Sequence, residues 1–299
     1  MATVVLLVPL VVAMAACGRS GFEVHPDASP DAYDGVGDGR APSSCLGTGA
    51  FTNLRVLPNV NSTASNTGAE ISKDELALYF NTNVSATSIV VSTRSTRADV
   101  FSSPMEVVLP GGDAGDPSLT GDNLELYFSS GRSGASCIYR ASRAVSTVAF
   151  GAPVVLAPLC GSTSAGAAIS ADGLVLVYNI TIDTFGEGDL YVSRRATRTD
   201  DFPVGARLAN LPANVGYAWL SADQLRLYFE HTIGNNIELY SASRVSPTDD
   251  FTNIQPIAEL DDGNSSNVDL SLDPSESTIY FSTNREGSDN IWTATRPCL

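Results

Sequence analysis

The segment ISADGLVLVY at residues 169–178 decides the fold, because the chain repeats it. It has the pattern of a strand end, a tight turn at Ser-x-Asp-Gly, and a second strand that ends in an aromatic residue. Related segments are ISKDELALYF (71–80), LTGDNLELYF (119–128), LSADQLRLYF (220–229) and LSLDPSESTIYF (270–281). The shared aspartates, at positions 74, 122, 172, 223 and 273, are 48, 50, 51 and 50 residues apart, which indicates an internal structural repeat.

Each copy continues with a second apolar strand that closes in arginine and a further strand that starts at phenylalanine. The arginine strands are SIVVSTR (88–94), CIYRASR (137–143), DLYVSRR (189–195), ELYSASR (238–244) and NIWTATR (290–296). Four antiparallel strands in about fifty residues are typical of a propeller blade, whose faces are both buried. We therefore expect an all-β fold, with the turn aspartates bonded to their own backbone rather than to a ligand.

The segments ISADGLVLVY and GDLYVSRR resemble the TolB-type, WD-like propeller repeat over residues 51–296. Proline is absent from most of the turns, and the turn glycine survives only at Gly173. The resemblance implies a propeller that in many members binds other proteins, and it implies no catalysis.

Five copies predict five four-stranded blades, with six as the alternative. The chain starts the repeat with an isolated outer strand at Phe51 and ends after the third strand of the last copy. We therefore expect the N-terminal strand to complete the last blade, which removes two free strand edges.

The cysteines fit this closure. Cys298 follows the last strand and Cys45 precedes the first, so a Cys45–Cys298 disulfide would join the two ends of the domain. Cys137 and Cys160, at the start of the third and the end of the fourth strand of one blade, form the second predicted pair.

Residues 1–16 are predicted to be a signal peptide, since the apolar run at 3–16 is too short to span a bilayer comfortably. The following MAACG resembles a bacterial lipobox, which implies lipidation of Cys17; an ordinary secretory signal is the alternative. Residues 17–44 read as a disordered acidic, proline-rich tether, and 45–299 as the propeller. We expect an extracytoplasmic protein of the cell envelope, anchored to the outer membrane on its periplasmic or surface face.

The formal net charge of −16 argues against nucleic acid or anionic lipid as a partner. We expect a monomer that touches the membrane only through its anchor. No histidine triad, phosphate loop or paired metal-binding cysteines occur in the sequence.

The loops that lead into the innermost strands bring acidic and aromatic residues toward the predicted central channel. Counted back from the turn aspartates, Glu70 and Asp269 share one offset, and Asp116 lies two residues earlier on the same side of its strand. Tyr217 and Trp219 belong to the same region of the fourth copy, where Trp219 suits core packing as well as ligand stacking.

These carboxylates could remain solvated or hold water. They could also hold a cation, and Ca²⁺ is the cofactor that suits several carboxylate and carbonyl ligands. A glycosidase, with catalytic Glu70, Asp116 and Asp269, is the alternative. The favoured interpretation is a binding or scaffolding module for an envelope protein or glycan.

Overall fold

The structure is a computed structural model that describes residues 46–83, 87–160, 164–181 and 188–298. The predictions for the signal peptide, Cys17, the tether and Cys45 lie outside the described residues. In the described chain the helical turns are η1 (Ala157–Leu159) and η2 (Ala258–Leu260), and the rest of the regular structure is β. No helix within these ranges is long and apolar enough to cross a membrane. The all-β prediction is confirmed.

The strands pair in antiparallel fashion and form four sheets. The first sheet contains β2 (Asn66–Ile71), β3 (Ala77–Thr82), β4 (Ser88–Thr93) and β5 (Met105–Glu106). The second contains β6 (Gly115–Leu119), β7 (Glu125–Ser130), β8 (Cys137–Ser142) and β9 (Val154–Val155). The last contains β18 (Asn267–Leu272), β19 (Thr278–Thr283), β20 (Asn290–Thr295) and β1 (Thr52–Val56).

The remaining sheet has eight strands in two halves. One half contains β10 (Ser164–Ile169), β11 (Val175–Thr181), β12 (Gly188–Arg194) and β13 (Ala206–Arg207). The other contains β14 (Val215–Leu220), β15 (Arg226–Ile233), β16 (Asn236–Ser243) and β17 (Thr252–Pro256). A single residue pair, Gly188 with Val215, joins the halves. We number the resulting groups as units: unit 1 is β2–β5, unit 2 is β6–β9, unit 3 is β10–β13, unit 4 is β14–β17, and unit 5 is β18–β20 with β1.

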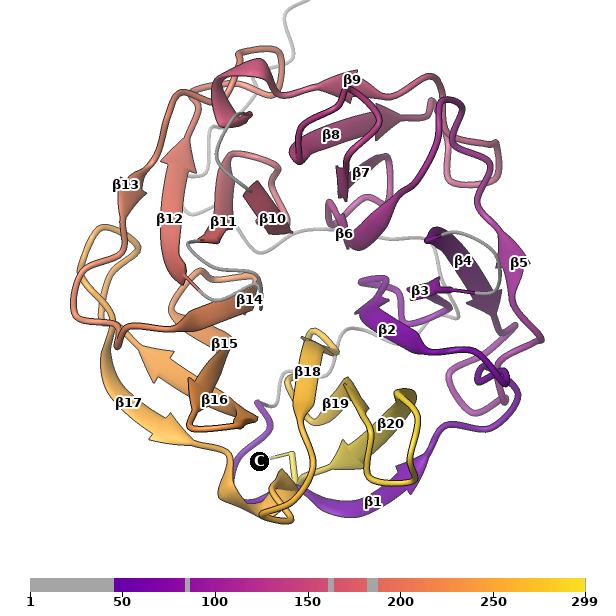
Figure 1. The fold of residues 1–299 in the computed structure, drawn as a ribbon, viewed down its shortest axis with the longest axis vertical. Helices are drawn as coiled ribbons and strands as arrows, with labels where there is room; N and C mark the ends of the chain where they lie inside the picture. The colour runs from indigo at the N-terminus through magenta and orange to yellow at the C-terminus, as the bar shows by residue number, and fades with distance from the viewer. Residues whose placement is uncertain (1–45, 84–86, 161–163, 182–187, 299) are drawn as a thin grey trace, which may run out of the picture. The chain divides into compact units, whose positions relative to one another are not determined.

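The first strands of the units, β2, β6, β10, β14 and β18, surround a common centre, and the later strands lie progressively farther out (Figure 1). Each of these inner strands contacts the inner strand of the next unit, and β18 contacts β2.

The apolar pair that ends the second strand of each repeat, Tyr-Phe in four repeats and Val177–Tyr178 in the third, explains why both faces of a sheet are apolar. Successive residues of a strand point to opposite faces. Phe80 packs with Tyr280 and Ile291 of unit 5, whereas Tyr79 packs with Leu119 of unit 2. Each sheet is thus enclosed between two neighbours, and its strands need apolar residues at consecutive positions.

The arginine and phenylalanine of each repeat form a cation–π pair within their unit. The guanidinium carbon lies 4.2 to 4.5 Å from the ring centroid in all five units. The pairs are Arg94–Phe101, Arg143–Phe150, Arg195–Phe202, Arg244–Phe251 and Arg296–Phe51. The same arginines donate through Nε to a backbone carbonyl of the inner turn, which fixes the third strand against that turn.

The turn aspartates of units 1 to 4 are structural, as the sequence predicted. In unit 1, Oδ1 of Asp74 accepts hydrogen bonds from Ser72 Oγ at 2.5 Å and from the Leu76 amide at 3.0 Å. The equivalent bonds occur at Asp122, Asp172 and Asp223.

The fifth aspartate is not equivalent to the others, which corrects the sequence alignment. The Asp273 amide donates to Thr278 O, just as the Ser72 amide donates to Ala77 O. Asp273 therefore occupies the serine position, and Ser275 occupies the aspartate position, where its hydroxyl donates to Asp273. The exchange preserves the hydrogen bond, which is why the aspartate spacing remained regular although the register had shifted by two residues.

The two ends of the described chain lie together. Strand β1 pairs with β20, and the Thr48 amide donates to Pro297 O at 2.9 Å. Gly47 forms an isolated antiparallel bridge with Cys298. Cys298 is itself in a disulfide, and its predicted partner, Cys45, lies outside the described residues.

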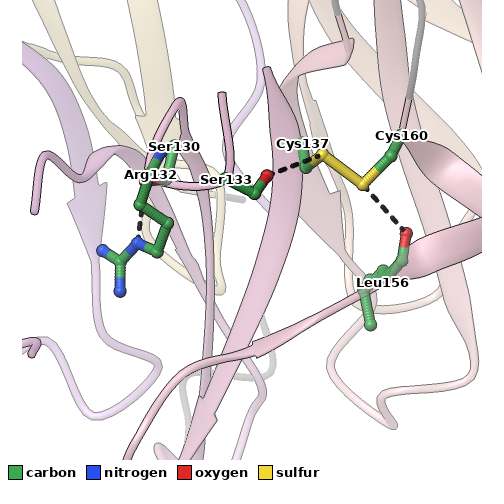
Figure 2. Close-up of a disulfide and its surroundings, with 6 residues drawn as sticks. All are labelled: Ser130, Arg132, Ser133, Cys137, Leu156 and Cys160. Atoms are coloured by element: carbon green, nitrogen blue, oxygen red, sulfur yellow. Dashed lines mark hydrogen bonds between the residues drawn. A yellow bond between two sulfur atoms is a disulfide. The ribbon is translucent and has the colours of Figure 1, made fainter. Parts of the chain in front are cut away.

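The second predicted disulfide, Cys137–Cys160, is present and joins β8 to the segment after η1 (Figure 2). Ser133 Oγ lies 3.7 Å from Cys137 Sγ, on the turn that also carries Arg132. Because Cys137 is buried in the core between units 1 and 2, the bond ties the outer part of unit 2 to that core.

Candidate functional site

The five inner strands share a β-bulge at the same position. The pairing register shifts between Thr67 and Glu70 in β2, and the corresponding shift occurs in β6, β10, β14 and β18. The bulge residues are Gly68, Asp116, Gly166, Tyr217 and Asp269. All but Tyr217 have a positive φ, between 52° and 69°. Two aspartates are therefore held in a backbone conformation that favours glycine, and bulges commonly serve to re-aim a side chain.

The bulge residues line a narrow cavity at the centre of the inner strands, together with Glu70 and small neighbouring residues. The empty space between the lining atoms is about 330 Å³, counting the part open to solvent. Asp116, Tyr217 and Asp269 are half-buried, and Glu70 is buried. The structure thus brings together four of the five predicted site residues.

The predicted offsets within this group need correction. Glu70 pairs with Tyr79, and the residue in the equivalent position of unit 5 is Ser271, which pairs with Tyr280. Asp269 is therefore the counterpart of Asp116, while Glu70 lies two residues further along its strand. The cause is the shifted turn of unit 5 described above.

Trp219, the fifth predicted residue, does not line the cavity. Its side chain is 4% exposed and packs edge-on against Tyr228, with ring centroids 5.8 Å apart, in the core between units 4 and 5. Core packing, one of the two interpretations that the sequence left open, is the role that this geometry supports.

Hydrogen bonds between adjacent units hold the carboxylates in place. Glu70 Oε1 accepts from the Leu119 amide of unit 2 at 3.1 Å. Asp269 Oδ2 accepts from the Gly68 amide of unit 1 at 3.1 Å. Asp116 exchanges two hydrogen bonds with Asn81 of unit 1, at 2.9 and 3.1 Å.

Glu230 is a fourth carboxylate beside this site, and the sequence analysis missed it. It is 4% exposed, and its Oε1 accepts the Asp269 amide at 2.5 Å. Glu230 follows the Tyr-Phe pair of unit 4. The position after the corresponding pair is polar in every unit, and its residues are Asn81, Ser129, Asn179, Glu230 and Ser282. This regular polar position after an aromatic pair was the available signal, since a polar residue in a strand buried on both faces needs a partner.

Burial and mutual repulsion keep these acids protonated to unusually high pH. Burial raises the pKa of Glu70 to about 7, and burial together with the charge of Asp116 raises the pKa of Asp269 to about 8. Burial also raises the pKa of Asp116, although hydrogen bonds from Asn81, Ser129 and Tyr217 oppose it. Burial, reinforced by the charge of Asp269, places the pKa of Glu230 well above its usual value.

Lys73 lies at the other end of the inner strands and is the only lysine of the sequence. It follows β2 of unit 1, yet its Nζ lies 4.7 Å from the centroid of the Trp219 ring in unit 4. Units 1 and 4 are not neighbours, so this side chain reaches across the centre. Burial lowers the pKa of Lys73, while the charge of Glu70 opposes that change.

The predicted Ca²⁺ site at Glu70, Asp116 and Asp269 is not matched by a metal-binding group among the described side chains. Across the described ranges, no group of three or more His, Cys, Asp or Glu side chains could hold a metal ion. The carboxylates instead spend hydrogen-bonding capacity on amides of the adjacent units.

Comparisons with known proteins identify the fold. No family model matches the chain, and a search of curated proteins found no match. Among solved structures, a GH43_1 enzyme from Xanthomonas citri complexed with xylotriose has a TM-score of 0.58 at 14% identity, over 81% of this chain and 89% of that one. A GH62 α-L-arabinofuranosidase catalytic domain from Coprinopsis cinerea has 0.54 at 11%, over 86% and 98%. A TolB homologue from Agrobacterium tumefaciens has a TM-score of 0.50 at 16% identity, over 77% of this chain and 76% of that one. These likenesses show a TolB-like propeller fold.

Proposed function

We propose that this chain is a five-bladed propeller, closed by its N-terminal strand, that acts as a lipid-anchored extracytoplasmic binding module for an envelope protein or glycan. The five units with equivalent turns, bulges and Arg–Phe pairs support the blade count. The pairing of β1 with β20 and the stacking of Arg296 on Phe51 support the closure.

One observation favours binding over catalysis. The carboxylates at the centre are bonded to amides of neighbouring units, so they connect the inner strands and do not face one another as a free acid and base. His231, the histidine of the described ranges, packs edge-on against Tyr240 in β15–β16, and the cavity lining contains no histidine. We place the recognition surface on the loops before the inner strands, since binding residues commonly lie on loops held by a rigid scaffold.

Capture from envelope extracts tests this function. The full chain with Cys17→Ser, which removes the predicted lipid site, is immobilised and compared with variants carrying charge reversals in the loops at 58–65 and 261–266. We expect a specific protein or glycan that is retained by the parent chain and lost with the loop variants. Retention that depends instead on the turns around residues 74 and 223, or no specific retention, would reject the loop surface.

The lipid anchor is tested separately. Metabolic labelling with an alkyne fatty acid should label the chain in a bacterial host and fail with Cys17→Ser. Label that persists in this variant would place the modification elsewhere, and a soluble unlabelled parent chain would support the secretory alternative.

A glycosidase is the second candidate, because four carboxyl groups with raised pKa values surround one cavity and enzymes of similar fold act on glycans. Hydrolysis on a panel of aryl arabinosides and xylosides tests it. Activity that disappears with Glu70→Gln, Asp116→Asn or Asp269→Asn would establish catalysis and displace the binding module as the main function.

A further inference from the structure

We propose that the central cavity binds a small organic cation with N–H donors, a guanidinium or a primary ammonium group such as a partner's arginine or lysine side chain would insert. This inference rests on the proposed binding function and names the chemistry that its central site recognises.

The charge balance of the cavity carries the first step. Asp116, Glu230 and Asp269 form no ion pair with a described Lys, Arg or His side chain, although sixteen of the chain's seventeen basic residues are arginines that could have supplied one. The residues that line the cavity include no basic side chain. Lys73 acts on Glu70, so the three other carboxylates are the uncompensated group.

The second step concerns Asn179, a buried residue beside this region. Asn179 is 1% exposed, and its Nδ2 donates to Val215 O at 2.7 Å, which fixes the orientation of the amide. Its Oδ1 has no hydrogen-bond partner. Asn179 occupies the position from which Asn81, in unit 1, bonds to the cavity residue Asp116. Its Nδ2 contact with β14 and its absence from the cavity lining leave this oxygen outside the site, so it does not argue for a donor there.

The lining favours a compact, flat cation. The Tyr217 ring packs so closely on residue 166 that a Cβ there would lie 2.2 Å from Tyr217 Cδ1, so Gly166 allows the ring to form one wall. An aromatic wall beside carboxylates suits a guanidinium, which stacks on rings and donates from its edge. A bare metal ion does not fit, since the described side chains form no metal-binding group.

Binding of such a cation would favour the ionised carboxylates and release protons near neutral pH. The groups that face it are Asp116 and Asp269 from the bulges, Glu230 from β15, Glu70 from β2 and the Tyr217 hydroxyl. Lys73 approaches from the opposite end of the inner strands.

Isothermal titration of the full Cys17→Ser chain with ethylguanidinium chloride, at constant ionic strength and pH 7, tests the proposal. Ethylurea is the neutral control of the same shape, and tetramethylammonium is the cation without N–H donors. We expect saturable one-to-one binding of ethylguanidinium, at least tenfold weaker binding of both controls, and proton release that appears as a difference between phosphate and Tris buffers.

Variants locate the site. Asp269→Asn should weaken ethylguanidinium binding at least tenfold, whereas Asp189→Asn, which removes a carboxylate paired with Arg207 on the outer surface, should leave it unchanged. Folding of each variant is checked by its thermal melt. No saturable binding to the parent chain, equal binding of ethylurea, or equal losses in the two variants would each overturn the inference.

Ethylguanidinium titration and partner capture test the cation site and the binding function separately. A partner captured through the loops by a chain that binds no ethylguanidinium would leave the binding module intact and remove the cation site. Ethylguanidinium binding without a captured partner would support the cation site and reject the binding module.

Discussion

Arg296 lies over the ring of Phe51, with its guanidinium carbon 4.5 Å from the ring centroid, although these residues stand at opposite ends of the domain. In units 2 and 4 the same contact joins an arginine and a phenylalanine that are close together along the chain. The N-terminal strand is thus held in unit 5 by the same interaction that holds each fourth strand. The guanidinium of Arg296 also donates to the Tyr228 hydroxyl of unit 4 at 2.8 Å, so the contact couples closure to the neighbouring unit.

Phe51→Ala should destabilise the domain by about 3 to 5 kcal/mol, the usual range for a buried phenylalanine in a core. Urea unfolding measures the change, and Phe251→Ala is the matched variant with an Arg partner in continuous chain. If Phe51 fixes the closure, hydrogen exchange in β1 and β20 rises in Phe51→Ala and not in Phe251→Ala. Equal exchange in both variants would mean that β1 is held without this contact.

Removal of the Cys137–Cys160 bond should lower stability by about 3 kcal/mol, since it releases a loop of intermediate length. The cysteines are 23 residues apart. The Cys137→Ala/Cys160→Ala variant is compared with the parent chain by denaturant unfolding without reductant. Peptide mapping of the parent under the same conditions should also recover Cys298 bonded to Cys45; a peptide in which Cys298 is bonded to any other cysteine would refute the predicted clasp.

The buried acids should make stability fall as the pH rises from about 5 to about 8, above the range in which paired carboxylates with lowered pKa values, such as Asp122 and Asp223, ionise. The pKa of Asp269 is about 8 in the folded chain, compared with about 3.9 for an unperturbed aspartate. Between these values the folded state binds more protons than the unfolded state, so each such group destabilises the fold by up to about 1.4 kcal/mol per pH unit as the pH increases. Unfolding free energies at pH 5, 6, 7 and 8 give the slope.

Asp269→Asn is the control for this pH dependence. The amide cannot ionise, so the slope between pH 5 and 8 should become shallower, and Glu70, Asp116 and Glu230 contribute to the slope that remains. Asp189→Asn on the outer surface should retain the slope of the parent chain. An unchanged slope in Asp269→Asn would show that this carboxyl does not titrate in the window.

Lys73→Met should raise the pKa of Glu70 above about 7, because the charge of Lys73 lowers it in the parent chain. Carboxyl-carbon NMR titration of glutamate-labelled protein measures the shift, with assignment from Glu70→Gln. Lys73→Arg keeps the charge and should leave the pKa of Glu70 close to its original value. The same pKa in Lys73→Met and the parent would mean that the ammonium does not act on Glu70.

The repeat determined much of the fold from sequence alone. Consecutive apolar residues such as Tyr79 and Phe80, followed at regular intervals by arginine and phenylalanine, specify strands enclosed on both faces, and the structure confirms antiparallel sheets of that kind. The pairing of Cys137 with Cys160 was likewise readable, because the cysteines stand at strand ends that antiparallel pairing can place side by side.

Only the tertiary structure decided how the central site is built. The bulge that aligns Asp116 with Asp269 changes the register without changing the repeat length, so counting residues from the turns assigned Asp269 the wrong counterpart. Glu230 was invisible as a site residue because its partner, the Asp269 amide, belongs to another unit. Local sequence specifies each unit, whereas the acidic cavity arises from contacts between units, and these depend on how the strands twist and pack around a common centre.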